Sequence, residues 1–255
     1  MAIDAARARA ESTAVAVLGI DIGYPHKTGQ WLGQVIEQYS MGAEMKFHWE
    51  GLGKNQVAVL KQTGSTLRKS AYYLAGGTAL AIYFGHRLSV DLDWFTSQNM
   101  GDALILAQKL RTAGFNFKTD QTAPGTLHGS IAKVRVTFLE FHYPLLKPLV
   151  HWKEMDCSLA SLEDLACMKL SAIAQRGARK DFCDIYALGT KRFEFKEMLE
   201  LYQRKFKIQD ISHVLYGVVY FDDAEKERMP KMLWDVKWAE IKKVIQGWVK
   251  EVEKR

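Results

Sequence analysis

The hydrophobic and polar positions along the chain change their period near its middle. Up to about residue 145, short β-prone stretches predict strands, over 70–77 (ending in a tight turn), 89–95 and 130–144. The segments between them predict short helices, over 54–67, 78–84 and 101–115. Beyond residue 157 apolar residues recur every three or four positions, which predicts helices over 158–177, 178–189, 195–206, 211–221 and 236–252. This order predicts an α+β fold, in which a small mixed β-sheet core is followed by a helical C-terminal half.

Composition along the chain suggests three parts. Residues 1–44 open with an Ala/Arg run, and Met45 begins a stretch that reads as a natural start. We expect 1–44 to be an extension of uncertain role, either upstream of that start or an added element packed on the core. Residues 45–155 would form the sheet core and residues 156–255 the helical domain.

Composition, net charge and cysteine content limit the kinds of function that the chain can have. A chain of 255 residues that is 48% hydrophobic can bury a core. A formal net charge of +6 suits a polyanionic partner such as RNA or a nucleoside triphosphate (NTP), although many ordinary basic proteins share it. The cysteines (Cys157, Cys167 and Cys183) form no C-x-x-C pair, which argues against a metal knuckle and favours the reducing cytoplasm. No apolar run approaches the ~20 residues that cross a bilayer, so we expect no membrane partner.

The stretch "GHRLSVDLDWF" places polar side chains at every second position. Ser89, Asp91 and Asp93 therefore share one face of the predicted strand, with Val90, Leu92 and Trp94 on the other. Two carboxylates so close together repel each other unless a cation lies between them. Mg²⁺ prefers such oxygen ligands, often together with substrate phosphates. The alternative is a D-x-D pair on a solvated strand face.

A glycine turn precedes this strand. Gly76 and Gly77 let the backbone approach a ligand closely, and Thr78 is placed to cap the helix that follows. The N–H groups at a helix start bind phosphate. With Arg87 in front of the strand, the turn favours a phosphate cradle beside a metal-binding strand over a solvated face.

A second polar cluster lies in the helical half. Ser161 is placed to cap the helix over 158–177 and Gly177 to end it. Lys169 falls within this helix's apolar stripe, either as a lysine that extends to the surface or as a contact for a triphosphate. Asp181 and Asp184 follow one helical turn apart. Locally, Asp184 could pair with Lys180, and Asp181 could favour the helix start.

Together these motifs resemble a known family. "GGTALAIYFGHRLSVDLDWF" resembles the first motif of the nucleotidyltransferase superfamily, and its second half is similar to the AbiEii/AbiGii (MenT-type) toxin branch. "EDLACMKL" fits that branch's D-x₄-K motif as Asp164 and Lys169, and "RKDFCDIYAL" fits its later motif. The resemblance covers about residues 45–238. It implies a toxin of a two-gene system with a cognate antitoxin. Some members transfer nucleotides from NTPs to the 3′ end of tRNA.

The resemblance also implies a set of site residues. The catalytic set would be Ser89, Asp91, Asp93, Lys169 and Asp184, with Mg²⁺ on Asp91 and Asp93. The nucleotide-binding set would be Gly76, Gly77, Thr78, Arg87, Lys169, Arg176, Lys180 and Asp181.

One departure concerns a third carboxylate, which many superfamily members carry on a later strand. Thr137 falls at that place here, and Glu140 falls on the opposite face. Two other functions therefore stay open. The protein could be a weak or inactive module that binds NTP or a partner, or it could transfer nucleotides to a small molecule or a protein.

Overall fold

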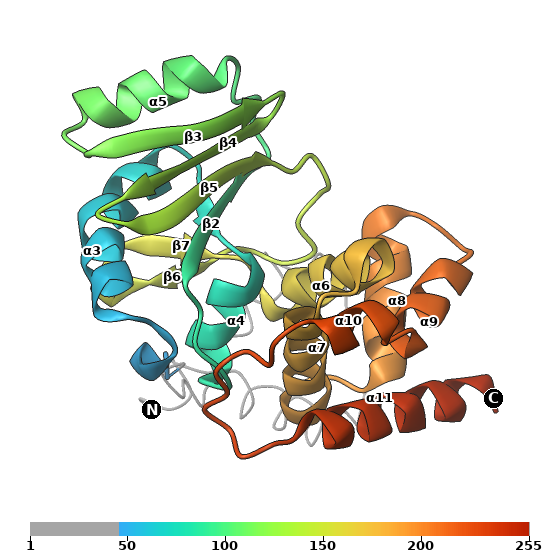
Figure 1. The fold of residues 1–255 in the computed structure, drawn as a ribbon. Helices are drawn as coiled ribbons and strands as arrows, with labels where there is room; N and C mark the ends of the chain where they lie inside the picture. Colours follow the sequence, from blue (N-terminus) through green and yellow to red (C-terminus); the bar gives the residue numbers. More distant parts are fainter. Residues whose placement is uncertain (1–45, 255) are drawn as a thin grey trace, which may run out of the picture. The chain divides into compact units, whose positions relative to one another are not determined.

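The structure, a computed structural model, describes residues 46–254. Residues 47–255 form one compact unit, and the predicted extension over 1–44 lies outside the described residues. The described part has a β-sheet followed by packed helices, which confirms the predicted α+β class (Figure 1). The sheet extends past the predicted boundary at residue 155, because its last strand ends at Leu159.

Within residues 46–254, seven strands form one mixed sheet in the order β3-β4-β5-β2-β1-β7-β6. β2 pairs in parallel with β5 and antiparallel with β1, so it lies at the centre of the sheet. The strands are β1 (Tyr73–Leu74), β2 (Asp91–Thr96), β3 (Phe117–Ala123), β4 (Thr126–Ile131), β5 (Val134–Glu140), β6 (Val150–Trp152) and β7 (Cys157–Leu159).

Alternation along β2 gives the sheet one apolar and one polar face. Leu92 and Trp94 are wholly buried, whereas Asp91 and Asp93 on the opposite face are only partly buried. Val90 was expected on the apolar face, but it lies just before the strand and is 67% exposed. The two-residue period holds only within the strand itself.

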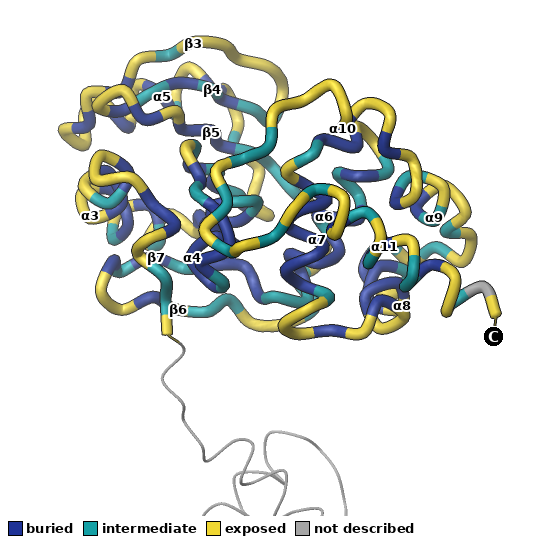
Figure 2. Tube along the Cα trace, turned by 60° about the horizontal axis from the view of Figure 1, so that its bottom comes forward, coloured by how far each residue is buried: buried dark blue, intermediate teal, exposed yellow. Residues whose placement is uncertain are grey.

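Three helices accompany the sheet. α3 (Lys54–Lys69) packs against β5 and β7, and α5 (Ala103–Thr112) packs against β3 and β4. α4 (Gly76–Phe84) connects the glycine turn to β2 and contacts α6 and α7 of the helical half. In Figure 2, buried residues follow α4, α6 and α7, so the two halves share their most buried helices.

The helical half begins with α6 (Leu162–Arg176). The Ser161 hydroxyl accepts a hydrogen bond from the Asp164 backbone N–H at 3.0 Å, and Gly177 ends the helix with a φ of +55°. Both predicted ends of α6 are therefore confirmed. The remaining helices are α7 (Arg179–Lys191), α8 (Phe195–Phe206), α9 (Ser212–Val219), α10 (Asp222–Lys226) and α11 (Trp238–Glu253).

The strand predicted over 130–144 is confirmed only in its middle, where β5 runs from Val134 to Glu140. Its first residues belong to the end of β4 and to a hairpin turn, in which Ala132 and Lys133 adopt φ values of +49° and +67°. Two positive φ values define the tight turn that fits strand twist, but such turns usually hold Asn or Gly. An Ala-Lys turn carries no such signal, and β3 and β4 were not predicted.

The predicted cap at Thr78 is also wrong. α4 begins at Gly76 with Ala75 before it, so Thr78 lies inside the first turn, and its side chain bonds elsewhere. Among the described helices, none is long and apolar enough to span a bilayer.

Candidate active site

The glycine turn packs directly against the polar face of the sheet. Gly76 has a φ of +66°, and a Cβ there would lie 3.2 Å from Asp93 Oδ2. A Cβ on Gly77 would lie 2.1 Å from Arg87 Nη2. Any side chain at Gly77 would displace Arg87. The absence of a side chain there lets the glycine turn pack against Arg87. Phosphate binding by this turn stays a prediction.

Asp91 and Asp93 lie side by side on β2, as the alternation predicts. Asp91 Oδ1 accepts a hydrogen bond from Arg135 Nε at 3.0 Å. Burial and the neighbouring charge of Asp91 raise the pKa of Asp93, while Lys169 and a hydrogen bond from Thr137 oppose that rise. Burial is the larger cause of the raised pKa and repulsion by Asp91 the second, and a cation between the two carboxylates would oppose both.

The neighbouring strand bears no carboxylate at this level. Thr137 on β5 stands directly beside Asp93 in the parallel register, as predicted. Glu140 pairs with Thr96 on the other face and accepts the Met100 N–H at 2.6 Å. In the described part of the chain, no three His, Cys, Asp or Glu side chains gather as a metal site. A metal ion here would therefore take two carboxylates and complete its shell with other oxygens, a set that fits Mg²⁺ bound to phosphates.

Ser89 and Thr78 support the backbone just before Asp91. Their hydroxyl oxygens lie 2.6 Å apart in the buried interior, and the Thr78 hydroxyl also donates to the Asp91 carbonyl. This pair joins the first turn of α4 to the start of β2. Ser89 thus contacts Thr78, which holds the backbone of Asp91 in place. A catalytic role for Ser89 stays a prediction.

Asp184 is the centre of a buried ionic cluster behind the glycine turn. It is wholly buried and accepts hydrogen bonds from Arg87 Nε at 2.7 Å and Nη2 at 2.9 Å, and from His86 Nε2 at 2.8 Å. Lys169 Nζ lies 2.6 Å from its other oxygen. Although burial alone would raise the pKa of Asp184, Arg87 and Lys169 hold it well below its usual range. Asp184 is therefore ionised.

Lys169 joins Asp184 to Asp181. It is buried and lies 2.8 Å from Asp181 Oδ1, while Arg176 Nε donates to Asp181 Oδ2 at 2.9 Å. The predicted alternatives are both wrong: Lys169 does not extend to solvent, and Asp184 pairs with residues distant in sequence and not with Lys180, which is exposed. His86 belongs to the cluster and was missed, because a histidine beside an arginine carries no periodic signal.

The cluster carries more positive than negative charge. Two buried cations (Arg87 and Lys169) balance two buried carboxylates (Asp181 and Asp184), and Arg176, whose side chain is 56% exposed, adds one net positive charge at the edge of the cluster. Electrostatic coupling reaches Asp93 from Lys169 and from Lys180. A pair of carboxylates that needs a cation thus lies beside a site with excess positive charge, an arrangement suited to an anion that carries its own metal ion.

Comparison with known proteins identifies the family. The model of the family described as "Nucleotidyl transferase AbiEii toxin, Type IV TA system" matches residues 60–246, well over half of the chain. The chain belongs to the AbiEii nucleotidyltransferase toxin family. This match confirms the resemblance read from the motifs, and it extends beyond residue 238, where that resemblance ended.

Two relatives of this AbiEii-family chain show how far the likeness extends. An uncharacterized protein of Aquifex aeolicus (strain VF5), aq_aa25, is 34% identical over 205 residues, which cover 78% of this chain and 97% of that protein. The structure of MenT4, a nucleotidyltransferase toxin from Mycobacterium tuberculosis H37Rv, is 14% identical and has a TM-score of 0.52. It covers 87% of this chain and 96% of MenT4, and at this identity it shows a shared fold.

The two charged residues of the D-x₄-K motif of the AbiEii-family chain lie in different surroundings. Lys169 lies in the cluster, but Asp164 faces away from it and accepts the Ser161 hydroxyl at 2.7 Å and Lys205 Nζ at 2.6 Å. Asp164 also accepts the backbone N–H of Leu146 at 3.0 Å. Asp164 therefore anchors α8 and the segment before β6, and Lys205 is its missed partner.

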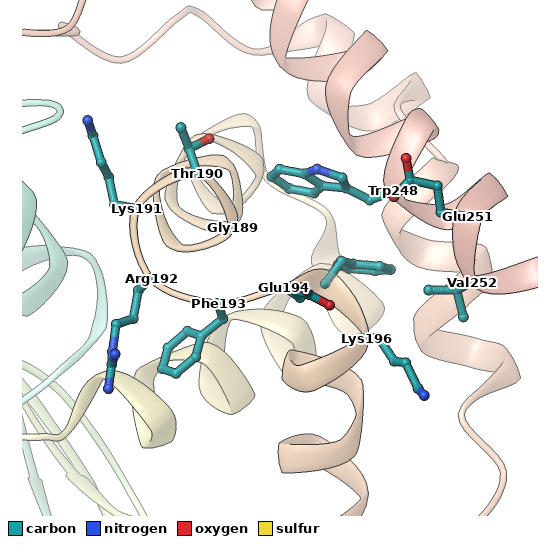
Figure 3. Close-up of a pocket in the computed structure, with 11 residues that line it drawn as sticks. Gly189, Thr190, Lys191, Arg192, Phe193, Glu194, Lys196, Trp248, Glu251 and Val252 are labelled. Carbon is teal, nitrogen blue, oxygen red and sulfur yellow. The ribbon is translucent and has the colours of Figure 1, made fainter. Parts of the chain in front are cut away.

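An open cavity of about 570 Å³ lies elsewhere in the AbiEii-family fold (Figure 3). It is bounded by the C-terminal end of α7, the start of α8 and the end of α11. None of the predicted site residues lines it, and Lys191, Arg192 and Lys196 extend away from its centre in Figure 3. The cavity is therefore separate from the carboxylate strand.

Proposed function

We propose that this protein is a toxin that transfers a nucleotide from an NTP to the 3′ end of a tRNA, with Mg²⁺ held by Asp91 and Asp93. The observation that carries the proposal is the carboxylate pair on β2 beside an ionic cluster whose one excess positive charge lies on the exposed Arg176. An NTP with its metal ion supplies both missing partners, a cation for the carboxylates and an anion for the cluster. The basic net charge supports a polyanionic acceptor.

In the proposed reaction, the chain's own residues bind and position. Gly77, Thr78 and Lys169 would face the triphosphate, and Arg87 would keep Asp184 in place behind them. The hydroxyl of the acceptor attacks the α-phosphate, and pyrophosphate leaves with the electron pair of the broken P–O bond. Mg²⁺, when bound, neutralises the phosphate charge and polarises the reacting phosphate. Positioning and charge neutralisation account for most catalysis in such transfers.

The direct test is incubation with each radiolabelled NTP, Mg²⁺ and total tRNA, followed by gel separation. Asp91→Ala and Asp93→Ala should each lower transfer by about 100-fold or more, since they remove metal-dependent stabilisation of several kcal/mol. Both variants should fold. Asp120→Asn, on exposed β3, is the matched control and should keep full activity. Full transfer by either alanine variant would contradict the assignment.

A second candidate is a module that binds NTP without turnover. The observation that favours it is Thr137 at the place of a third carboxylate. Equilibrium binding of a fluorescent NTP with no label on any RNA, protein or small molecule would select this candidate. Label on protein or on a small molecule would instead show a different acceptor.

We also propose that a cognate antitoxin neutralises the protein, as its membership of a toxin–antitoxin family implies. Expression of the chain alone should arrest growth, and coexpression of the adjacent gene should restore it. The Asp93→Ala variant is the control, since it should not arrest growth.

A further inference from the structure

Three neighbouring strands place Asp93, Thr137 and His128 in one row across the polar face of the sheet. Asp93 on β2 pairs with Thr137 on β5, and Thr137 pairs with His128 on β4. The parallel register sets Thr137 directly beside Asp93, where hydrogen bonding by its hydroxyl lowers the pKa of that carboxyl, and Thr137 Oγ1 lies 3.3 Å from His128 Nδ1. Side chains on the opposite face of these strands, such as Phe138 and Leu127, are wholly buried. The row therefore belongs to the face that carries the carboxylate pair.

The chemistry of the three groups sets the direction of these hydrogen bonds. An ionised Asp93 can only accept, so the Thr137 hydroxyl donates to it. The Thr137 oxygen then accepts from His128, which places the imidazole proton on Nδ1. Nε2 is left with its lone pair. Of the residues that the structure describes, none hydrogen-bonds to this nitrogen.

Other histidines of the described chain are committed elsewhere. His86 is wholly buried, with Nε2 bound to Asp184. His142 pairs with Glu140, whose side chain lies on the other face of the sheet. His151 on β6 pairs with Asp156. His128, unlike these three, is oriented by the row that begins at Asp93, and it is only partly buried.

We propose that His128 is a further catalytic residue, the proton acceptor for the attacking hydroxyl. This inference rests on the proposed nucleotidyl transfer. As the hydroxyl oxygen bonds to the α-phosphate, its proton passes to His128 Nε2, and the bond to pyrophosphate breaks. Thr137 fixes the tautomer, so it is a positioning residue. β5 bears no carboxylate beside Asp93, and through Thr137 it orients a base on the next strand, β4.

The kinetic test uses single-turnover transfer with saturating NTP and RNA. His128→Ala should lower the transfer rate by about 100-fold, the contribution typical of a positioned base, with NTP affinity unchanged. Added imidazole should restore part of the rate. His151→Ala is the matched control, since it removes a half-exposed histidine at the far edge of the sheet and should change nothing. A rate within threefold of the parent for His128→Ala would overturn the proposal.

A second variant pair distinguishes a base from a structural role. Thr137→Asp in the His128→Ala background places a carboxylate beside Asp93, where it can take the proton itself. The double variant should transfer at least tenfold faster than His128→Ala alone, whereas Thr137→Asn in the same background should give no increase. Equal recovery by both would show that His128 acts through packing.

An NMR measurement separates this proposal from the proposed function. The ¹⁵N shifts of His128 should report a proton on Nδ1 and none on Nε2 when Mg²⁺ and a non-hydrolysable NTP analogue are present. Thr137→Val should remove that preference. A proton on Nε2 in the parent would overturn the proposal even if transfer is observed. If no NTP is transferred to any acceptor, the proposed function fails, and the Nδ1 tautomer would still support the hydrogen-bonded row.

Discussion

Two buried ionic groups lie on α6, five residues apart in sequence, and they differ in what they leave unsatisfied. Asp164 meets one lysine, one hydroxyl and two backbone N–H groups, all from this chain. Lys169 meets two carboxylates but shares them with two arginines, so its cluster has one positive charge in excess. Two charged residues of one motif therefore have different roles: Asp164 holds parts of the fold together, and Lys169 belongs to the candidate active site.

Two charged residues of one motif can have different roles, one in stability and one in binding. A buried pair whose hydrogen bonds close within the chain needs nothing more, and its loss should affect folding alone. A cluster with an excess charge at its exposed edge, beside two repelling carboxylates, can still take a ligand. Substitutions in the two groups should therefore differ in whether they change stability, ligand binding or both.

The largest effect is expected for Asp184→Asn. It leaves Arg87 and Lys169 with a neutral partner in the interior, which should lower the free energy of unfolding by about 3–5 kcal/mol. Since the pKa of Asp184 is lowered in the folded state, its stabilisation is present above the ordinary Asp pKa and is lost as the pH falls below it. Urea unfolding of parent and variant should therefore converge toward acid pH. A gap independent of pH would contradict this assignment of charge.

Lys205→Met should have the next largest effect, and on stability alone. The variant keeps the buried stem but leaves Asp164 without its cation, at a cost of about 3 kcal/mol in the free energy of unfolding. The transfer rate and NTP affinity of the folded fraction should stay unchanged. A loss of NTP affinity at temperatures well below the melting point would show that the anchor also serves the site.

Lys169→Met is the matched change in the other group, and it should alter both properties. NTP affinity should fall by an order of magnitude or more, from the loss of a charge-assisted contact of roughly 1.5–3 kcal/mol. Because Asp181 and Asp184 keep Arg176, Arg87 and His86, the stability loss should be smaller than for Asp184→Asn. Equilibrium NTP titration and urea unfolding measure the two effects. Parent-like NTP binding would make this cluster a second anchor.

The smallest effect, with the opposite sign, is expected for Asp93→Asn without metal. Its raised pKa means that ionised Asp93 destabilises the fold above the ordinary Asp pKa, and this penalty is absent at lower pH. Melting temperature at neutral pH should rise slightly in the variant and match the parent in acid. Added Mg²⁺ should stabilise the parent but not the variant. A lower melting temperature at neutral pH would show that Asp93 supports the fold.

Much of the site could be predicted because its motifs are local. Alternation on β2 placed Asp91 and Asp93 together, and the Ser161 cap and Gly177 stop placed α6 within a residue of its ends. α8 has the predicted bounds, Phe195–Phe206. These features depend on the two-residue and roughly 3.6-residue spacing of side chains and on the residues at helix ends, which are all close together in sequence.

The fold class, the carboxylate strand and the toxin family could be predicted from the chain alone, since each depends on local periodicity or short motifs. Which charges meet is visible only in the folded protein. Arg87 and Asp184 lie 97 residues apart in sequence, and Lys205 and Asp164 lie 41 apart. His128 reaches Thr137 only through a hairpin whose Ala-Lys turn carries no turn signal. A side chain's partners across the chain follow from packing and strand register, and no period along the sequence records them.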